Sequence, residues 1–178
     1  RKMEQEMATV VFFWNGKSKY SLKEVLANDI AGQVLNIVYT EEIREKEGGT
    51  YGVSVVPMTQ NEPTKKSCLQ IVYQTDPARA EELNDKIVDI INEFAAAGPS
   101  AGNLSKIKEY MTKNYNENLR ENSFYQSTMR EWLTTGCDQL TDWEQTLNGI
   151  TSKDVAKSVK NVLKQKNAMK LVMNGYTE

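Results

Sequence analysis

The stretch of sequence that decides the fold joins a long amphipathic segment to a strand, and it reads Ile43-Arg44-Glu45-Lys46-Glu47-Gly48-Gly49-Thr50-Tyr51. The two glycines predict a turn, because glycine readily adopts the left-handed conformation that ends many helices. This turn should bring a permanent cation, Arg44, and a phenol donor, Tyr51, towards one edge of a sheet. Such a pair is suited to holding a peptide carbonyl or an oxyanion.

Upstream of this turn, an apolar residue recurs at every fourth position. The repeat consists of Leu22, Leu26, Ile30, Val34 and Val38. This spacing is typical of a helix with one apolar face. Ser21 and Glu24 have the spacing of a capping box, in which each side chain satisfies a free backbone N–H group at the helix start. The pattern therefore predicts a helix of roughly seven turns that ends at Gly48.

Strands are predicted on both sides of this helix. Residues 7–14 are rich in Thr, Val, Phe and Trp, and Asn15-Gly16 then suggests a turn or a strand end. Residues 51–56 and 69–73 form two further strands, joined by a polar loop that spans residues 59–67. The pair of strands and their loop predict a hairpin.

The rest of the chain is predicted to be mostly helical. Asp76-Pro77 should begin a second helix and Gly98-Pro99 should end it. Further helices are expected near residues 104–119, 123–135, 142–147 and 152–165, before a closing strand at 168–173. This order lacks a short alternating βαβ repeat. It predicts an α+β fold, with a mainly antiparallel sheet and helices packed on one face.

The chain is expected to form one α+β domain over residues 1–178. Its polar opening, Arg1-Lys2-Met3-Glu4, does not resemble a signal peptide, and we interpret the domain as a fragment of a longer multi-domain chain. The sequence leaves the compartment open between the cell envelope, including the periplasm, and the cytoplasm. Cys68 and Cys137 could pair, although isolated buried thiols are the favoured interpretation.

Charge and hydropathy exclude two classes of partner. The net charge is −2 with both signs interleaved, so there is no basic field to attract nucleic acid. An apolar run of the ~20 residues that a membrane span needs is also missing from the sequence. We therefore expect neither a nucleic-acid partner nor a membrane span.

The absence of histidine excludes most hydrolytic centres from this chain. A catalytic zinc site or a Ser-His-Asp triad cannot be assembled without it. Gly48-Gly49 leads from a helix into a strand, which is the reverse of a phosphate-binding loop. The downstream aromatic residues have helical spacing and are interpreted as core; they are Tyr110, Tyr115, Phe124, Tyr125, Trp132 and Trp143.

Arg44 and Tyr51 also have an ordinary structural interpretation. Arg44 lies among acidic neighbours, so local ion pairs at an exposed helix end would explain it. Tyr51 could be an aromatic residue at a strand edge. These alternatives stay open on the residues alone.

The chain resembles the C-terminal, non-zinc half-domain of the insulinase/pitrilysin family, the inverted-motif zinc metallopeptidases that include the mitochondrial processing peptidases. The resemblance is carried by Ile43-Arg44-Glu45-Lys46-Glu47, a glycine, and the strand Tyr51-Gly52-Val53-Ser54-Val55. The order of the predicted elements is similar over nearly the whole chain. It includes Ile150-Thr151-Ser152-Lys153-Asp154-Val155 before the last helix.

The resemblance implies a division of labour between two half-domains that close like a clamshell. One half carries the H-x-x-E-H zinc site, and the other supplies an arginine and a tyrosine seven residues apart. Arg44 and Tyr51 match this spacing, whereas H-x-x-E-H is missing from the sequence. The family implies that Arg44 and Tyr51 bind substrate and stabilise the transition state, while the zinc belongs to a partner half.

The implied function is thus the substrate-binding half of a zinc metallopeptidase that hydrolyses peptides or unfolded polypeptides. Its partner would be a zinc-bearing half-domain in the same polypeptide or in a separate subunit. The chain alone should be inactive and should hold no metal or other cofactor, because it has no zinc ligands or catalytic residues of its own. The alternative is an inactive scaffold or assembly subunit of the same family.

Overall fold

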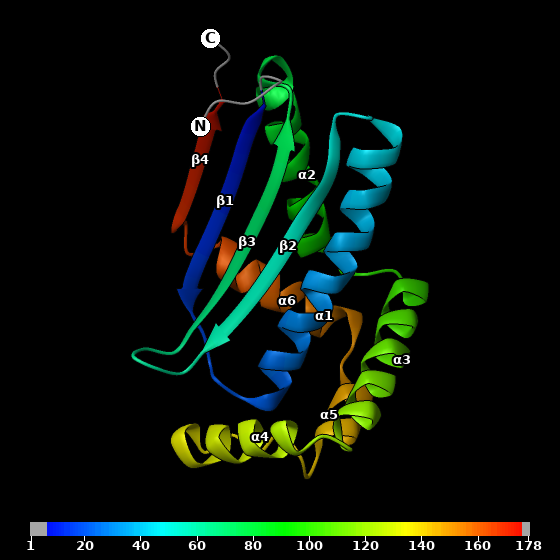
Figure 1. Ribbon diagram of the computed structural model, residues 1–178, viewed down its shortest axis with the longest axis vertical. Coiled ribbons are helices and arrows are strands. Elements are labelled where there is room, and N and C mark those ends of the chain that lie inside the picture. The colour runs from blue at the N-terminus through cyan, green and yellow to red at the C-terminus, as the bar shows by residue number, and fades with distance from the viewer. Residues whose placement is uncertain (1–6, 176–178) are drawn as a thin grey trace.

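The computed structural model describes residues 7–175 and contains one antiparallel sheet with helices gathered on one of its faces (Figure 1). The elements in chain order are β1 (Ala8–Lys17), α1 (Leu22–Tyr39), η1 (Thr40–Lys46), β2 (Thr50–Gln60), β3 (Lys66–Thr75), η2 (Pro77–Arg79), α2 (Ala80–Ala97), α3 (Ala101–Asn118), α4 (Asn122–Thr135), α5 (Trp143–Gly149), α6 (Ser152–Leu163) and β4 (Ala168–Asn174). The α+β prediction is confirmed, and so is the packing of helices on one face of the sheet.

The four strands lie in the order β2-β3-β1-β4, and every neighbouring pair is antiparallel. β1 is central because it pairs with both β3 and the distant β4. Phe12, for example, lies opposite Ile71 on β3 and Lys170 on β4. Side chains alternate along β1, so that Ala8, Val10, Phe12 and Trp14 are buried under the helices while their neighbours lie on the open face.

The core lies between this sheet and the helices α1, α2 and α6. Its fully buried side chains include Ile30, Leu35, Ile71 and Ile87. Tyr39 is buried at the end of α1, where its hydroxyl donates to the Ile87 carbonyl at 2.9 Å. This bond satisfies a polar group that would otherwise destabilise the core.

The long helix before the glycine turn differs from the prediction in its second part. After Tyr39 the helix continues as a π-helix, η1, in which each turn is widened by one residue. The Thr40 hydroxyl donates to the Asn36 carbonyl at 2.7 Å, at the point where the widening begins. Ile43 is buried in this segment, whereas the adjacent Arg44 is exposed.

The expected turn or strand end at Asn15-Gly16 is wrong, because β1 continues through both residues to Lys17. Asn15 donates its N–H to the Asn167 carbonyl at 3.0 Å, and the Asn167 amide donates to Asn15 Oδ1 at 2.6 Å. A Cβ at Gly16 would clash with the Gln165 side-chain amide. The glycine therefore permits close approach rather than a turn.

The predicted helix ends are confirmed at three positions. Gly48 and Gly98 have φ values of 60° and 77°, in the region that favours glycine. Asp76 Oδ1 accepts the Ala78 N–H at 2.8 Å, and Pro77 occupies the first turn. The short signals that end and begin helices are therefore reliable in this chain.

The aromatic residues of the helical region are divided between core and surface. Trp143 is buried, and Tyr115 stacks on it with ring centroids 3.9 Å apart. Tyr110, Tyr125 and Trp132 are exposed, so the core interpretation is wrong for these three. Sequence spacing alone did not distinguish an inward from an outward stripe.

Both cysteines are free, and Cys68 is buried while Cys137 is half-buried. Burial raises the pKa of both thiols, which disfavours the reactive thiolate. Over the described part of the chain, the helices are too short or too polar to cross a membrane.

Candidate functional site

The turn that carries the candidate site is fixed to α2 by charged groups. The Lys86 ammonium lies 2.6 Å from a Glu47 carboxylate oxygen, and Arg79 Nη1 donates to the Glu47 carbonyl at 3.2 Å. Hydrogen bonds from Lys86 to Glu47 and Glu82 raise the pKa of the lysine. Glu47, the residue before the two glycines, is therefore held in place through both its side chain and its backbone carbonyl.

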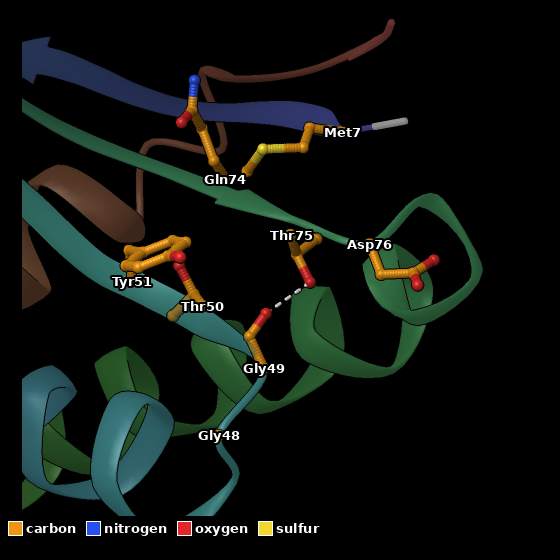
Figure 2. Close-up of a pocket in the computed structure, with 8 residues that line it drawn as sticks. All are labelled: Met7, Gly48, Gly49, Thr50, Tyr51, Gln74, Thr75 and Asp76. Atoms are coloured by element: carbon orange, nitrogen blue, oxygen red, sulfur yellow. Dashed lines mark hydrogen bonds between the residues drawn. The ribbon is translucent and has the colours of Figure 1, made fainter. Parts of the chain in front are cut away.

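Gly49 lies directly against α2 and β3. A Cβ at this position would be 2.8 Å from Leu83 Cδ1 and 2.9 Å from Arg79 Nη1. The Thr75 hydroxyl donates to the Gly49 carbonyl at 2.6 Å (Figure 2). The second glycine is therefore needed for close packing, which anchors the start of β2.

A β-bulge then sets the direction of Tyr51. Thr50 lies opposite Thr75 and Val53 lies opposite Tyr73, so both Tyr51 and Gly52 face the single residue between them on β3. The Thr50 hydroxyl accepts the Gly52 N–H at 3.2 Å and supports this local geometry. Bulges commonly redirect a side chain at the edge of a sheet.

Tyr51 is 89% exposed and lies on the wall of a hollow of about 400 Å³. Figure 2 shows the residues that line it, which are Met7, Gly48, Gly49, Thr50, Tyr51, Gln74, Thr75 and Asp76. Within residues 7–175 the phenol makes no hydrogen bond. It is therefore available as a donor to a molecule held in the hollow.

Arg44 lies outside the lining of this hollow, on η1 and on the other side of the glycine turn. Its side chain is exposed, and in the described part of the chain it forms neither an ion pair nor a hydrogen bond. The ion pair at this helix end is made instead by Lys46 and Glu42, 2.7 Å apart. Arg44 and Tyr51 thus flank one turn, but the described residues contain no hydrogen bond between them.

Sequence reasoning missed the β1 and β3 side of the hollow. Gln74 lies across from the bulge, and its amide donates to the Thr9 hydroxyl at 3.3 Å. Met7 lies directly before β1 and is far from Tyr51 in the sequence. The hairpin register would have pointed to Gln74, but no local signal placed Met7 there.

No group of three or more acidic or cysteine side chains in residues 7–175 is arranged to hold a metal ion. The hollow offers a hydrogen-bond donor in Tyr51, and Arg44 offers positive charge outside its lining. Both are suited to a carbonyl oxygen or a developing oxyanion.

Comparison with known proteins identifies a family of similar domains. Residues 1–111 match the family model described as the peptidase M16 inactive domain. No curated protein sequence is similar enough to match the chain.

Several solved structures with the same fold are described as proteases or as peptidase domains. The periplasmic protease PqqL from Escherichia coli is 21% identical, with a TM-score of 0.84 over 98% of this chain and 20% of its own. A protease from Helicobacter pylori is 17% identical, with a TM-score of 0.78 over 93% of this chain and 41% of its own. A peptidase M16 inactive domain from Pseudomonas fluorescens is 16% identical, with a TM-score of 0.75 over 96% of this chain and 42% of its own. The chain therefore spans between a fifth and about two-fifths of these three chains.

Proposed function

Because the chain belongs to the peptidase M16 inactive-domain family, we propose that it is the substrate-binding, non-zinc half of a zinc metallopeptidase. The observation that carries this proposal is the exposed phenol of Tyr51, which lies on the wall of a hollow and has no hydrogen-bond partner among residues 7–175. The substrate would be a peptide or an unfolded polypeptide. A zinc-bearing half, in the same polypeptide or in a separate subunit, would complete the site.

Tyr51 would act by donating a hydrogen bond to the oxygen of the scissile carbonyl. In the partner half, zinc would supply a Lewis acid and an activated water. The donor from Tyr51 would strengthen as negative charge develops on that oxygen in the transition state. Loss of one donor of this kind costs on the order of 3 kcal/mol in transition-state stabilisation.

Arg44 would bind and orient the substrate through its positive charge, from outside the hollow. Its exposed guanidinium has no ion pair among the described residues, so it does not have to give up a partner to bind substrate. A guanidinium offers a rigid fork of donors to a carbonyl or carboxylate group. The fixed turn that links it to Tyr51 would hold both residues in one relative arrangement.

Replacing Tyr51 with Phe in the full-length protein should lower kcat for peptide hydrolysis roughly a hundredfold or more, with a smaller change in KM. The substitution removes one hydroxyl from an exposed side chain, so the fold should survive. Tyr110→Phe is the matched control, because Tyr110 is also an exposed tyrosine but lies on α3. Wild-type kcat in the Tyr51 variant would remove this phenol from the mechanism.

An inactive assembly subunit is the second candidate, and α4 supports it. The face of α4 turned towards the domain carries Thr128 and Glu131, whereas Met129, Trp132 and Leu133 are exposed. An apolar helix face turned outwards is typical of a surface that contacts another domain. Under this alternative, Leu133→Asp would weaken assembly with the partner, while Tyr51→Phe would have no effect on any activity of the complex.

A further inference from the structure

A second hollow, of about 300 Å³, lies at the other end of β1 from the Tyr51 hollow. It is formed by the end of β1, the start of α1 and the last turns of α6. Its lining residues are Lys17, Ser18, Lys19, Glu24, Lys157, Asn161, Lys164 and Gln165. A ten-residue strand is about 30 Å long, so the two hollows are separate sites.

Positive charge is concentrated in this second hollow, which we term the lysine pocket. Four of its lining residues are lysines and one, Glu24, is a carboxylate, on a chain whose net charge is −2. Across residues 7–175, none of these four lysines has a carboxylate oxygen within 4.0 Å. Some lysines elsewhere are paired, such as Lys23 with Asp154 at 2.7 Å. The pocket therefore carries uncompensated positive charge.

The lysine pocket is held open by the side chain of Gln165. Its amide nitrogen donates to the carbonyl oxygens of Lys17 and Asn161, at 3.0 and 2.9 Å. Its amide oxygen accepts the Lys17 N–H at 2.8 Å. This residue therefore ties the end of β1 to the end of α6, two of the elements that form the pocket.

A buried polar atom in the pocket lacks a partner. The Ser18 hydroxyl oxygen is buried, and within the described residues it makes no hydrogen bond. The Ser18 backbone N–H is occupied, since it donates to the Lys65 carbonyl at 3.2 Å. A buried hydroxyl without a partner is costly, and an oxygen atom of a bound ligand would satisfy it.

Glu24 limits what the pocket can accept. Burial raises the pKa of its carboxyl group, while the charges of Lys157 and Lys19 act in the opposite direction. An anion in the pocket would therefore be attracted by four lysines and repelled by the Glu24 carboxylate. Two of the lysines, Lys157 and Lys19, already attract this carboxylate. The pocket should therefore attract an anion with more than one charge more strongly than a monovalent one.

We propose that the lysine pocket binds a small multivalent oxyanion of the phosphate type. Lysine ammonium groups bind phosphate as point charges, and the Ser18 hydroxyl would donate to a phosphate oxygen. A hollow of about 300 Å³ fits a pyrophosphate-sized group. The group could belong to a soluble phosphate compound or to a lipid headgroup, and the chemistry of recognition is the same for both.

Calorimetric titration of the chain with inorganic pyrophosphate, at constant ionic strength, tests the proposal. Wild type should bind, and the Lys157→Gln/Lys164→Gln double variant should bind roughly tenfold more weakly, because two of the four cations are lost. The matched control is Lys106→Gln/Lys113→Gln, which removes two exposed lysines from α3 and should leave the affinity unchanged. Equal weakening by both double variants would overturn the site, and so would a wild type that binds neither pyrophosphate nor the vesicles described below.

Two single variants distinguish a built site from a diffuse charge effect. Ser18→Ala should weaken pyrophosphate binding although it changes no charge, and Glu24→Gln should tighten it. An unchanged affinity in both variants would refute the pocket geometry. Thermal melting of each variant verifies that the fold is retained.

Vesicles of phosphatidylcholine with added phosphatidylglycerol identify the source of the oxyanion. Co-sedimentation that the lysine double variant abolishes would support the site with a lipid headgroup as its ligand. Pyrophosphate binding without co-sedimentation would support it with a soluble ligand. A wild-type chain that neither binds pyrophosphate nor co-sediments with the vesicles would refute the proposal. Neither experiment depends on Tyr51 or on peptidase activity.

Discussion

Gly32, in the middle of α1, determines how closely this helix approaches β2. A Cβ at this position would lie 2.5 Å from two ring atoms of Pro57. Four residues along the helix, the Asn36 amide donates to the Val55 carbonyl at 3.1 Å and its oxygen accepts the Val55 N–H at 2.8 Å. These contacts fix β2 on α1, and β2 in turn carries Tyr51.

Gly32→Ala should lower the free energy of unfolding by roughly 1 to 3 kcal/mol, because overpacking outweighs the better helix propensity of alanine. Gly102→Ala in α3 is the control, since a Cβ there has no neighbour within 4 Å. That variant should be neutral or more stable by up to about 1 kcal/mol. Urea denaturation of both variants measures the difference, and equal stability of the two would show that the approach of α1 to β2 is not tight.

At this scale the sequence was informative where the signal was local. The two glycines predicted the turn, and the resemblance to the metallopeptidase family pointed to Arg44 and Tyr51 as the candidate pair. The hollow beside Tyr51 could not be predicted, because Met7 and Gln74 reach it through strand pairing. The exposure of Trp132 was also missed, since an outward apolar stripe has the same spacing as a buried one.

At the scale of elements, the start of α6 connects it to α1. Thr151 and Asp154 form a capping box, in which the Thr151 N–H donates to Asp154 Oδ2 at 2.9 Å. The other carboxylate oxygen of Asp154 lies 2.7 Å from the Lys23 ammonium on α1. The hydrogen bond from Lys23, followed by those from Thr151, lowers the pKa of Asp154 from 3.8 to about 2.

Asp154→Asn should lower the free energy of unfolding at pH 7 by about 1 kcal/mol, because it loses the charge-assisted cap and the ion pair. A lowered pKa stabilises the folded state above the unfolded value of 3.8, and this contribution is lost as the pH falls towards 2. The difference between variant and wild type should therefore shrink between pH 4 and pH 2. Asp142→Asn, at a helix start without a side-chain cap, is the control. A difference that is independent of pH would contradict the assigned role of the carboxylate.

Element types and order were predictable from the sequence, but their irregularities were not. The repeat of an apolar residue at every fourth position stops at Val38, because Glu42 occupies the next position and the next aliphatic residue is Ile43, five residues on. This single longer step was too weak a signal to predict the wider π-helical turns. The bulge at Tyr51 and Gly52 adds one residue to β2, and it depends on the register with β3. Asn15-Gly16 was interpreted as a turn or a strand end. The close approach of Gly16 to Gln165 could not be predicted, because Gln165 lies near the other end of the chain.

At the scale of the whole molecule, the sheet has one face covered by helices and one face open (Figure 1). Exposed apolar residues lie on the two edge strands, including Val56 and Met58 on β2 and Met169 and Leu171 on β4. Under the proposed function, the open face would be turned towards the partner half and would help to exclude water from the site. The sequence predicted an antiparallel sheet, but the central position of β1 follows from its pairing with β4 across nearly the whole chain.

The most direct test of the account is peptide hydrolysis by this chain and by the zinc-bearing half, each assayed alone and then mixed. The account predicts that this chain alone is inactive and that the zinc-bearing half alone is slow. The mixture should be active, and it should lose most of that activity when this chain carries Tyr51→Phe. A zinc-bearing half that hydrolyses peptides equally fast without this chain would contradict the account.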